Sequence, residues 1–220
     1  MLSTTVRAVL LAGSLGTVAS LSAQQGPRPS GVPPLAGNQA GSAQAAPNIT
    51  STLDFQLSIV ERETVGLADA MPEDRYSFAP TKGEFQGVRT FAQQAKHIAT
   101  VNNRFFGAIL GQTPAAPGSQ FEAENGPDAI QTKADIIQYL RDSFALGHKA
   151  IATINAANAF VPMKAPPTPF LQTPAAVVIF DCSHTMDHYG QMVEYVRANG
   201  IVPPASRQRP PANPPSKPSS

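Results

Sequence analysis

Apolar residues recur every three to four positions in four segments of the chain, and polar residues fill the positions between them. This spacing is typical of amphipathic helices, whose apolar side faces a core. No segment shows the convincing alternation of apolar and polar residues that indicates a half-buried strand. The pattern therefore predicts four helices, at about residues 51–70, 85–110, 132–158 and 173–199. Helices with a single apolar side bury it best against one another, so we expect an all-α four-helix bundle.

Capping residues mark the ends of the first and last of these helices. Thr50 or Ser51 can begin the first helix by accepting a backbone N–H. Thr173 can cap the last helix, and Pro174 suits its first position, where the missing N–H would have no partner anyway. Gly200 can close the same helix in a left-handed conformation.

The two ends of the chain differ in composition from its middle. Residues 1–23 combine Arg7, the apolar stretch AVLLAGSLGTVASL and small residues up to Ala23, which is typical of a cleaved export signal. We therefore expect an exported protein, periplasmic or extracellular, with no membrane span in its mature form; an uncleaved N-terminal anchor is the alternative. Residues 24–48 predict a flexible linker rich in Pro, Gly and Ala, residues 49–203 the bundle, and residues 204–220 a disordered Pro-rich tail.

Charge and cysteine content narrow the possible partners. The net charge is +1 and the 16 Lys and Arg residues are scattered, so the sequence predicts no nucleic-acid partner and no attraction to a membrane surface. The single cysteine, Cys182, cannot form an internal disulfide, although small secreted domains often contain several. We expect it to be a small buried residue, and the bundle to depend on its buried apolar surface.

Two of the chain's 4 histidines, His184 and His188, lie four residues apart in the predicted last helix. Side chains at this spacing share one side of a helix, about 6 Å apart, so both imidazoles can reach a single metal ion. A third ligand would come from another helix, and His97 and His148 are the candidates. The residues alone leave open a second interpretation, in which the pair is accidental and His97 is a core histidine with a satisfied hydrogen bond.

The segment HTMDHYGQMVEYVRANGIVPPAS resembles the DinB-like (YfiT-like) family of four-helix bundles, which carry H-x-x-x-H and then Gly-Gln on the last helix. The phrase AKHIA is similar to the one that supplies the family's third ligand, and MPEDRYSFAPTKGEF resembles the family's first crossover. The resemblance covers about residues 50–206. It implies a bundle with crossover connections, for which the loops 71–84 and 159–173 are long enough. It also implies a metal site formed by His97, His184 and His188, and it makes a homodimer possible.

Three more residues are candidates for the surroundings of that site. Asp181 lies on the same line of the helix as the histidine pair and can accept the free N–H of a ligand histidine; alternatively, it is only an acidic residue favoured near the start of a helix. Gln191 can bind a substrate or a metal-bound water, or can have a structural role. Asn102, with its neighbour Asn103, lies about a turn beyond His97 and can line the same pocket. The sequence identifies no catalytic residue.

Three neutral imidazoles leave coordination positions open and suit a divalent ion such as zinc or nickel. An open position can hold hydroxide for hydrolysis or a thiolate for thiol transfer. The DinB-like family that the sequence resembles is associated with both reactions. Export disfavours thiol transfer, because oxidising compartments contain little low-molecular-weight thiol. We therefore expect a metal-dependent hydrolase of an unidentified small molecule. A non-catalytic metal-binding or interaction bundle and a thiol S-transferase are the alternatives.

Overall fold

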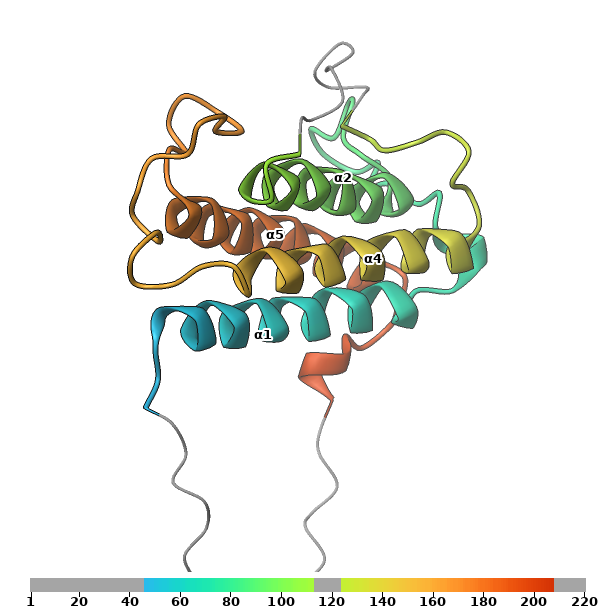
Figure 1. The fold of residues 1–220 in the computed structure, drawn as a ribbon. Helices are drawn as coiled ribbons and strands as arrows, with labels where there is room; N and C mark the ends of the chain where they lie inside the picture. The colour runs from blue at the N-terminus through green and yellow to red at the C-terminus, as the bar shows by residue number, and fades with distance from the viewer. Residues whose placement is uncertain (1–45, 113–123, 208–220) are drawn as a thin grey trace, which may run out of the picture. The chain divides into compact units, whose positions relative to one another are not determined.

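The computed structural model describes residues 46–112 and 124–207, and this part of the chain is helical (Figure 1). It contains four long α-helices and two 3-10 turns and no strand, so the predicted all-α fold is confirmed. The predicted signal of residues 1–23 lies outside the described residues, as do most of the predicted linker and tail. No helix in the described ranges has the length and apolar character needed to span a bilayer. In chain order the elements are α1 (Ile49–Ala70), η1 (Glu73–Arg75), α2 (Phe91–Ile109), α4 (Lys133–Ile151), α5 (Pro174–Ala198) and η2 (Pro204–Ser206).

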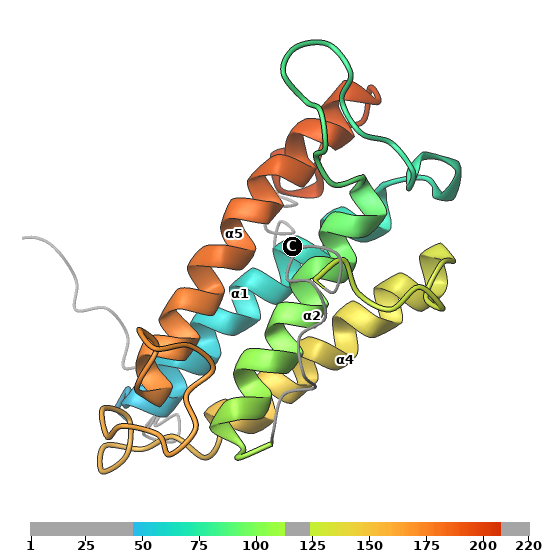
Figure 2. The same cartoon turned by 90° about the horizontal axis from the view of Figure 1, so that it is seen from above.

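The four helices pack in a ring in which α1 touches α4 and α5, and α2 touches the same two helices. Figure 1 shows α1 and α2 on opposite sides, with α4 and α5 between them, and Figure 2 shows the same bundle from above. The connections from α1 to α2 and from α4 to α5 therefore join helices that are diagonally opposed. The loops 71–84 and 159–173 both lie in connections between diagonally opposed helices. This confirms the predicted bundle with crossover connections.

Each helix contributes one apolar side to a continuous core, as its periodicity predicts. Large side chains from all four helices are fully removed from solvent in this core, and removing so much apolar surface from water is the main force that holds the bundle together. These side chains include Leu57, Leu67, Phe91, Ile98, Phe106, Ile136, Leu140, Phe144 and Met192.

Two predicted helix boundaries are wrong, because local hydrogen bonds make one helix begin later and another end earlier than apolar periodicity suggests. The second helix begins at Phe91 and not at Phe85, since Thr90 caps it reciprocally with Gln93. The third helix ends at Ile151 and not at Asn158. There the Asn158 side chain donates to the Thr153 carbonyl and accepts from the Asn155 N–H, which forms a separate turn.

Other boundaries agree with the sequence or differ by a residue or two. Thr173 caps α5 ahead of Pro174, and Gly200 follows the helix with a φ of +74°, as predicted. The first helix is capped by Asn48 in a capping box with Ser51, whereas the Thr50 hydroxyl donates to the Ile154 carbonyl. Residues 204–206, which we assigned to the tail, form η2, which packs against α1.

Gly147 is a position where three helices meet too closely for a side chain. A methyl group there would lie 2.8 Å from Leu57 on α1 and 2.8 Å from Phe106 on α2, and both of these side chains are fully buried. We expect Gly147→Ala to lower the free energy of unfolding by about 1 kcal/mol, because an overpacking cost of roughly 1–3 kcal/mol exceeds a helix-propensity gain of at most about 1 kcal/mol.

Urea unfolding of Gly147→Ala beside Gly66→Ala checks this prediction. Gly66 is also inside a helix, but a methyl group there would meet nothing within 4 Å, so only the propensity gain of up to about 1 kcal/mol is expected. Equal stabilisation of both variants would show that the contact around Gly147 is not tight.

Candidate metal centre

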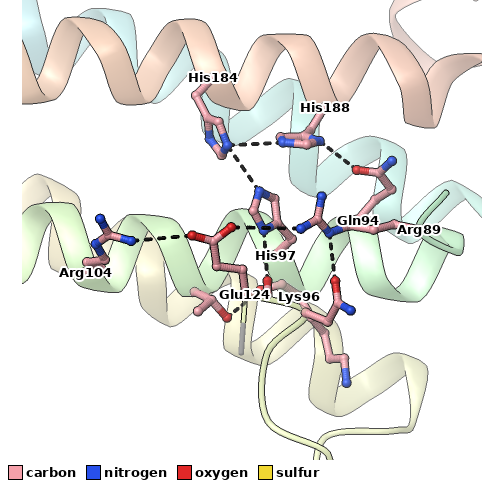
Figure 3. A network of polar contacts seen from close by, with 10 residues as sticks. Arg89, Gln94, Lys96, His97, Arg104, Glu124, His184 and His188 are labelled. Carbon is pink, nitrogen blue, oxygen red and sulfur yellow. Dashed lines mark hydrogen bonds and ion pairs between the residues drawn. The ribbon is translucent and has the colours of Figure 1, made fainter. Parts of the chain in front are cut away.

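Three histidines from two helices lie together inside the bundle. His97 comes from the middle of α2, and His184 and His188 lie one turn apart on α5. The Nε2 atom of His184 is 3.2 Å from Nε2 of His97 and 3.1 Å from Nε2 of His188 (Figure 3). His97 and His188 are only 3 % and 8 % exposed, and His184 is half-buried. The packing of α2 against α5 thus joins a local pair to a residue 87 positions earlier in the chain.

A backbone carbonyl determines which nitrogen of His97 carries the proton. The Nδ1 atom of this ring is 2.8 Å from the carbonyl oxygen of Glu124, in the loop before α4. A carbonyl can only accept, so Nδ1 is the donor. In a neutral ring the other nitrogen, Nε2, then has a free lone pair that points at the two histidines of α5.

A chain of side-chain hydrogen bonds determines which ring nitrogen of His188 carries the proton. At its outer end, Gln191 Nε2 donates to the Asp187 carboxylate (3.2 Å), which can only accept. The Gln191 Oε1 atom therefore accepts from Gln94 Nε2 (2.8 Å), and Gln94 Oε1 faces Nδ1 of His188 at 2.7 Å. The direction of the whole chain makes this Nδ1 a donor, which leaves Nε2 of His188 with its lone pair directed at the cluster.

All three imidazoles are held in the uncharged form. Burial, with smaller contributions from Arg89 and the neighbouring histidines, lowers the pKa of His97 to about 3. Burial, followed by the nearby His184 and Arg89, lowers the pKa of His188 to about 4. Burial also lowers the pKa of His184. Neutral imidazoles with bare nitrogens are the form in which histidine binds metals.

An ion network borders the cluster on the side of α2. The Glu124 carboxylate lies 3.4 Å from Arg104 and 4.0 Å from Arg89, while its backbone oxygen accepts from His97. Arg89 also donates from Nε to the Asn125 side chain at 2.7 Å. Figure 3 shows the Arg89 guanidinium reaching toward the side of the cluster where His97 and Glu124 meet.

Asp181 and Asn102, two of the other predicted site residues, contact each other in the core. Asp181 is fully buried, and burial raises its pKa well above the usual range. One of its oxygens is 3.3 Å from the side-chain amide of Asn102, which also contacts Ser143 on α4. Neither Asp181 nor Asn102 hydrogen-bonds to a histidine of the cluster within the described ranges. Their shared contact instead links α5 and α2 in the core.

Gln191 makes a structural contact, which is one of the two roles that the sequence left open for it. It is exposed on α5, and its amide holds Gln94. It therefore supports a ligand candidate, His188, through Gln94.

His148 is excluded from the cluster by its place in the ring of helices. It lies on α4, where Nδ1 is 2.6 Å from the Asp54 carboxylate and Nε2 is 3.1 Å from the Glu61 carboxylate, both on α1. Burial opposes the charged form, but the hydrogen bonds and charges of these two acids outweigh it, so the pKa of His148 is raised. The cation also sits in the last turn of α4, where the helix dipole favours positive charge.

This contact gives a prediction with a defined pH dependence. Because the folded-state pKa of His148 exceeds the unfolded value of about 6.5, its stabilisation is complete below that pH and is lost as the pH rises through the folded-state pKa. We expect His148→Gln to cost about 0.5–1 kcal/mol at pH 5.5 and distinctly less at pH 9, the small size reflecting the solvent exposure of the pair. Urea unfolding at the two pH values measures the difference. A cost that grows with pH would contradict the assignment.

Sequence reasoning missed Gln94, Glu124 and Arg89. Gln94 lies three residues before His97, so helical spacing was a usable signal for it. Glu124 accepts from His97 through its backbone oxygen, which any residue could provide, and Arg89 lies in the loop before α2 and pairs with the Glu124 carboxylate. No pattern in the chain indicates either contact.

Comparisons with known proteins agree with this architecture. The model of the DinB superfamily matches residues 56–192, which include the helices that carry all three histidines. Among solved structures, the crystal structure of an uncharacterised protein from Escherichia coli UTI89 aligns with a TM-score of 0.55 and 10 % sequence identity, over 71 % of this chain and 98 % of the other. At this identity the likeness concerns the fold alone. No curated protein matches the chain.

Proposed function

Because this chain belongs to the DinB superfamily, and because the Nε2 atoms of three buried or half-buried histidines converge in it, we propose that it binds a divalent metal ion through His97, His184 and His188. The convergence carries this proposal. The lone pairs on Nε2 of His97 and of His188 both face Nε2 of His184, and the buried Nδ1 of His184 has no hydrogen-bond partner within the described residues. A proton on Nε2 of a neutral His184 can be donated to only one of these two lone pairs, whereas a metal ion between the rings would bind all three nitrogens. Burial disfavours an additional, charging proton on any of these rings, so a metal ion is the occupant that satisfies all three nitrogens at once.

The donor set fits zinc or nickel. All three ligand atoms lie within 4.8 Å of one another, and the two closest pairs are 3.1 and 3.2 Å apart. Two nitrogens bound tetrahedrally to zinc at about 2.05 Å would be roughly 3.3 Å apart, so a small outward shift accommodates the ion. Imidazole suits zinc and nickel among the divalent ions, and a set of three leaves room for a further ligand.

We further propose that the protein is an exported metal-dependent hydrolase of a small molecule. A bound divalent ion would supply hydroxide near neutral pH from coordinated water. The Glu124 carbonyl holds His97, and the Gln94 side chain holds His188. Of the three histidines in the cluster, the half-buried His184 is the most exposed. The export signal predicted for residues 1–23 favours hydrolysis over thiol transfer, because it directs the protein away from the compartment rich in thiols.

Metal analysis and an activity screen test the proposal. The protein, purified without a histidine tag, should contain or take up about one zinc or nickel ion per chain. A panel of esters and amides should then reveal hydrolysis that a chelator abolishes, that added metal restores, and that the His184→Ala variant lacks. Metal binding without any hydrolysis would leave a non-catalytic metal-binding bundle. Failure to bind any divalent ion would overturn the whole proposal.

A further inference from the structure

Resting on the proposed metal site, we propose that Gly126 is a positioning residue for that site. Because glycine has no side chain, the loop of residues 124–127 can lie directly on α2, where the Glu124 carbonyl oxygen reaches Nδ1 of His97. Gly126 therefore acts on the metal through Glu124 and His97, without contacting the ion.

Gly126 lies closer to α2 than any side chain permits. A methyl group at this position would lie 2.9 Å from Cβ of Lys96, 3.1 Å from Oγ1 of Thr100 and 3.3 Å from the Lys96 carbonyl oxygen. Carbon atoms in ordinary contact are about 3.5–4.0 Å apart, so the methyl group would push the loop and the helix apart by roughly 0.5–1 Å. The φ of +80° at Gly126 also favours glycine.

The part of α2 that faces Gly126 is rigid. Cβ and the carbonyl oxygen of Lys96 are fixed to the helix backbone, and the adjacent Ile98 is fully buried in the core. The Thr100 hydroxyl donates to the Lys96 carbonyl at 2.8 Å and lies 3.1 Å from the Tyr139 hydroxyl on α4. These atoms cannot turn aside as the end of a long side chain can, so the loop would move and the helix would stay.

Two hydrogen bonds to α2 lie on either side of Gly126 in the loop. The Glu124 carbonyl accepts from Nδ1 of His97 at 2.8 Å (Figure 3), and the Pro127 carbonyl accepts from Nζ of Lys96 at 3.1 Å. Lifting the loop by roughly 0.5–1 Å would take the bond to His97 to or beyond the limit of about 3.2 Å for a normal N–H···O bond. His97 would then lose the partner that orients its ring and makes it more basic as a ligand.

Nitrogen-15 NMR of the full chain without metal tests the first step, because it shows which imidazole nitrogen carries the proton. In the wild type the His97 proton should be on Nδ1 and should exchange slowly with solvent. In Gly126→Ala this proton should exchange about tenfold faster, because its hydrogen bond is lost. The Nδ1 proton of His188, which Gln94 holds, should be unchanged in the same spectrum and serves as the internal reference.

A zinc competition titration of the same proteins tests the second step. Gly126→Ala should bind zinc about 10- to 100-fold more weakly than the wild type, as expected when a ligand histidine loses its orienting partner. Gly200→Ala is the matched control. Gly200 has a similar φ of +74°, but a methyl group there would meet nothing within 4 Å, so the variant has the backbone strain without the contact. Its zinc affinity and its His97 proton should equal those of the wild type.

Lys96→Met loosens the same loop without creating a clash. Methionine keeps most of the apolar stem of Lys96, which is only 9 % exposed, and removes the hydrogen bond to the Pro127 carbonyl. We expect faster exchange of the His97 proton and weaker zinc binding, both smaller in extent than in Gly126→Ala. This variant therefore decides the question if Gly126→Ala does not fold.

An unchanged His97 proton and unchanged zinc affinity in Gly126→Ala would overturn the inference and leave the metal proposal intact. Weaker zinc binding with an unchanged His97 proton would overturn it as well, because Gly126 would then act by another route. If Gly126→Ala does not fold, an unchanged His97 proton in folded Lys96→Met has the same consequence. If wild-type protein binds no zinc, the metal proposal fails and the positioning role of Gly126 fails with it, whatever the NMR spectra show.

Discussion

The His97→Ala protein is expected to bind zinc on the order of 10² to 10³ times more weakly than the wild type. This estimate divides the roughly 10–16 kcal/mol of a typical four-ligand zinc site evenly among its ligands. His97 is the informative choice because it is the only member of the cluster on α2, so its loss tests whether the packing of two helices creates the site. A competition titration with a zinc-binding dye measures the affinity. The shift in thermal midpoint on adding zinc should be large for the wild type and nearly absent for the variant.

His148→Ala is the matched control, since it removes a partly buried histidine that pairs with acids on α1 and lies outside the cluster. Its zinc affinity should equal that of the wild type. Circular dichroism of both variants without metal should show intact helices, although His97→Ala leaves the Glu124 carbonyl without its present donor. Equal zinc affinity in the wild type and His97→Ala would mean that α2 contributes no ligand.

Gln94→Leu is expected to lower zinc affinity by about 10- to 100-fold without removing any ligand. The Gln94 amide accepts from Nδ1 of His188 and is itself held by Gln191, so it determines which nitrogen of His188 faces the cluster. Partners of this kind orient the ring and raise its basicity, and their loss typically costs one to two orders of magnitude in metal affinity. Leucine has a similar volume, so the core around it should remain filled.

Gln94→Glu provides the comparison for this effect. A carboxylate keeps an acceptor for Nδ1 of His188, and Gln191 can turn its amide to donate to it. Zinc affinity should then equal or exceed that of the wild type, because a carboxylate partner makes the ligand imidazole more basic. Equally weak binding by the glutamate and leucine variants would show that packing at this position, and not the acceptor, controls the site.

The helices and the histidine pair are properties that local sequence determines. Apolar periodicity follows from the geometry of a single helix, so it identified all four helices of the described chain, and the Thr173-Pro174 and Gly200 signals identified both ends of α5. The spacing of His184 and His188 is equally local, because one turn separates them whatever α5 packs against. The helix ends near Phe85 and Asn158 were misjudged, because capping and turn bonds there compete with an apolar pattern that continues past them.

Everything that joins these parts depended on tertiary packing. Both His97 and His148 lie within predicted helices, so the sequence did not decide between them. The ring order of the helices places α2 beside α5, which brings His97 to the histidine pair, and α4 beside α1, which brings His148 to Asp54 and Glu61. The partners of the ligand candidates come from a loop carbonyl and from a glutamine chain between two helices. Such contacts depend on distances between segments far apart in the chain, and periodicity within one segment carries no information about those distances.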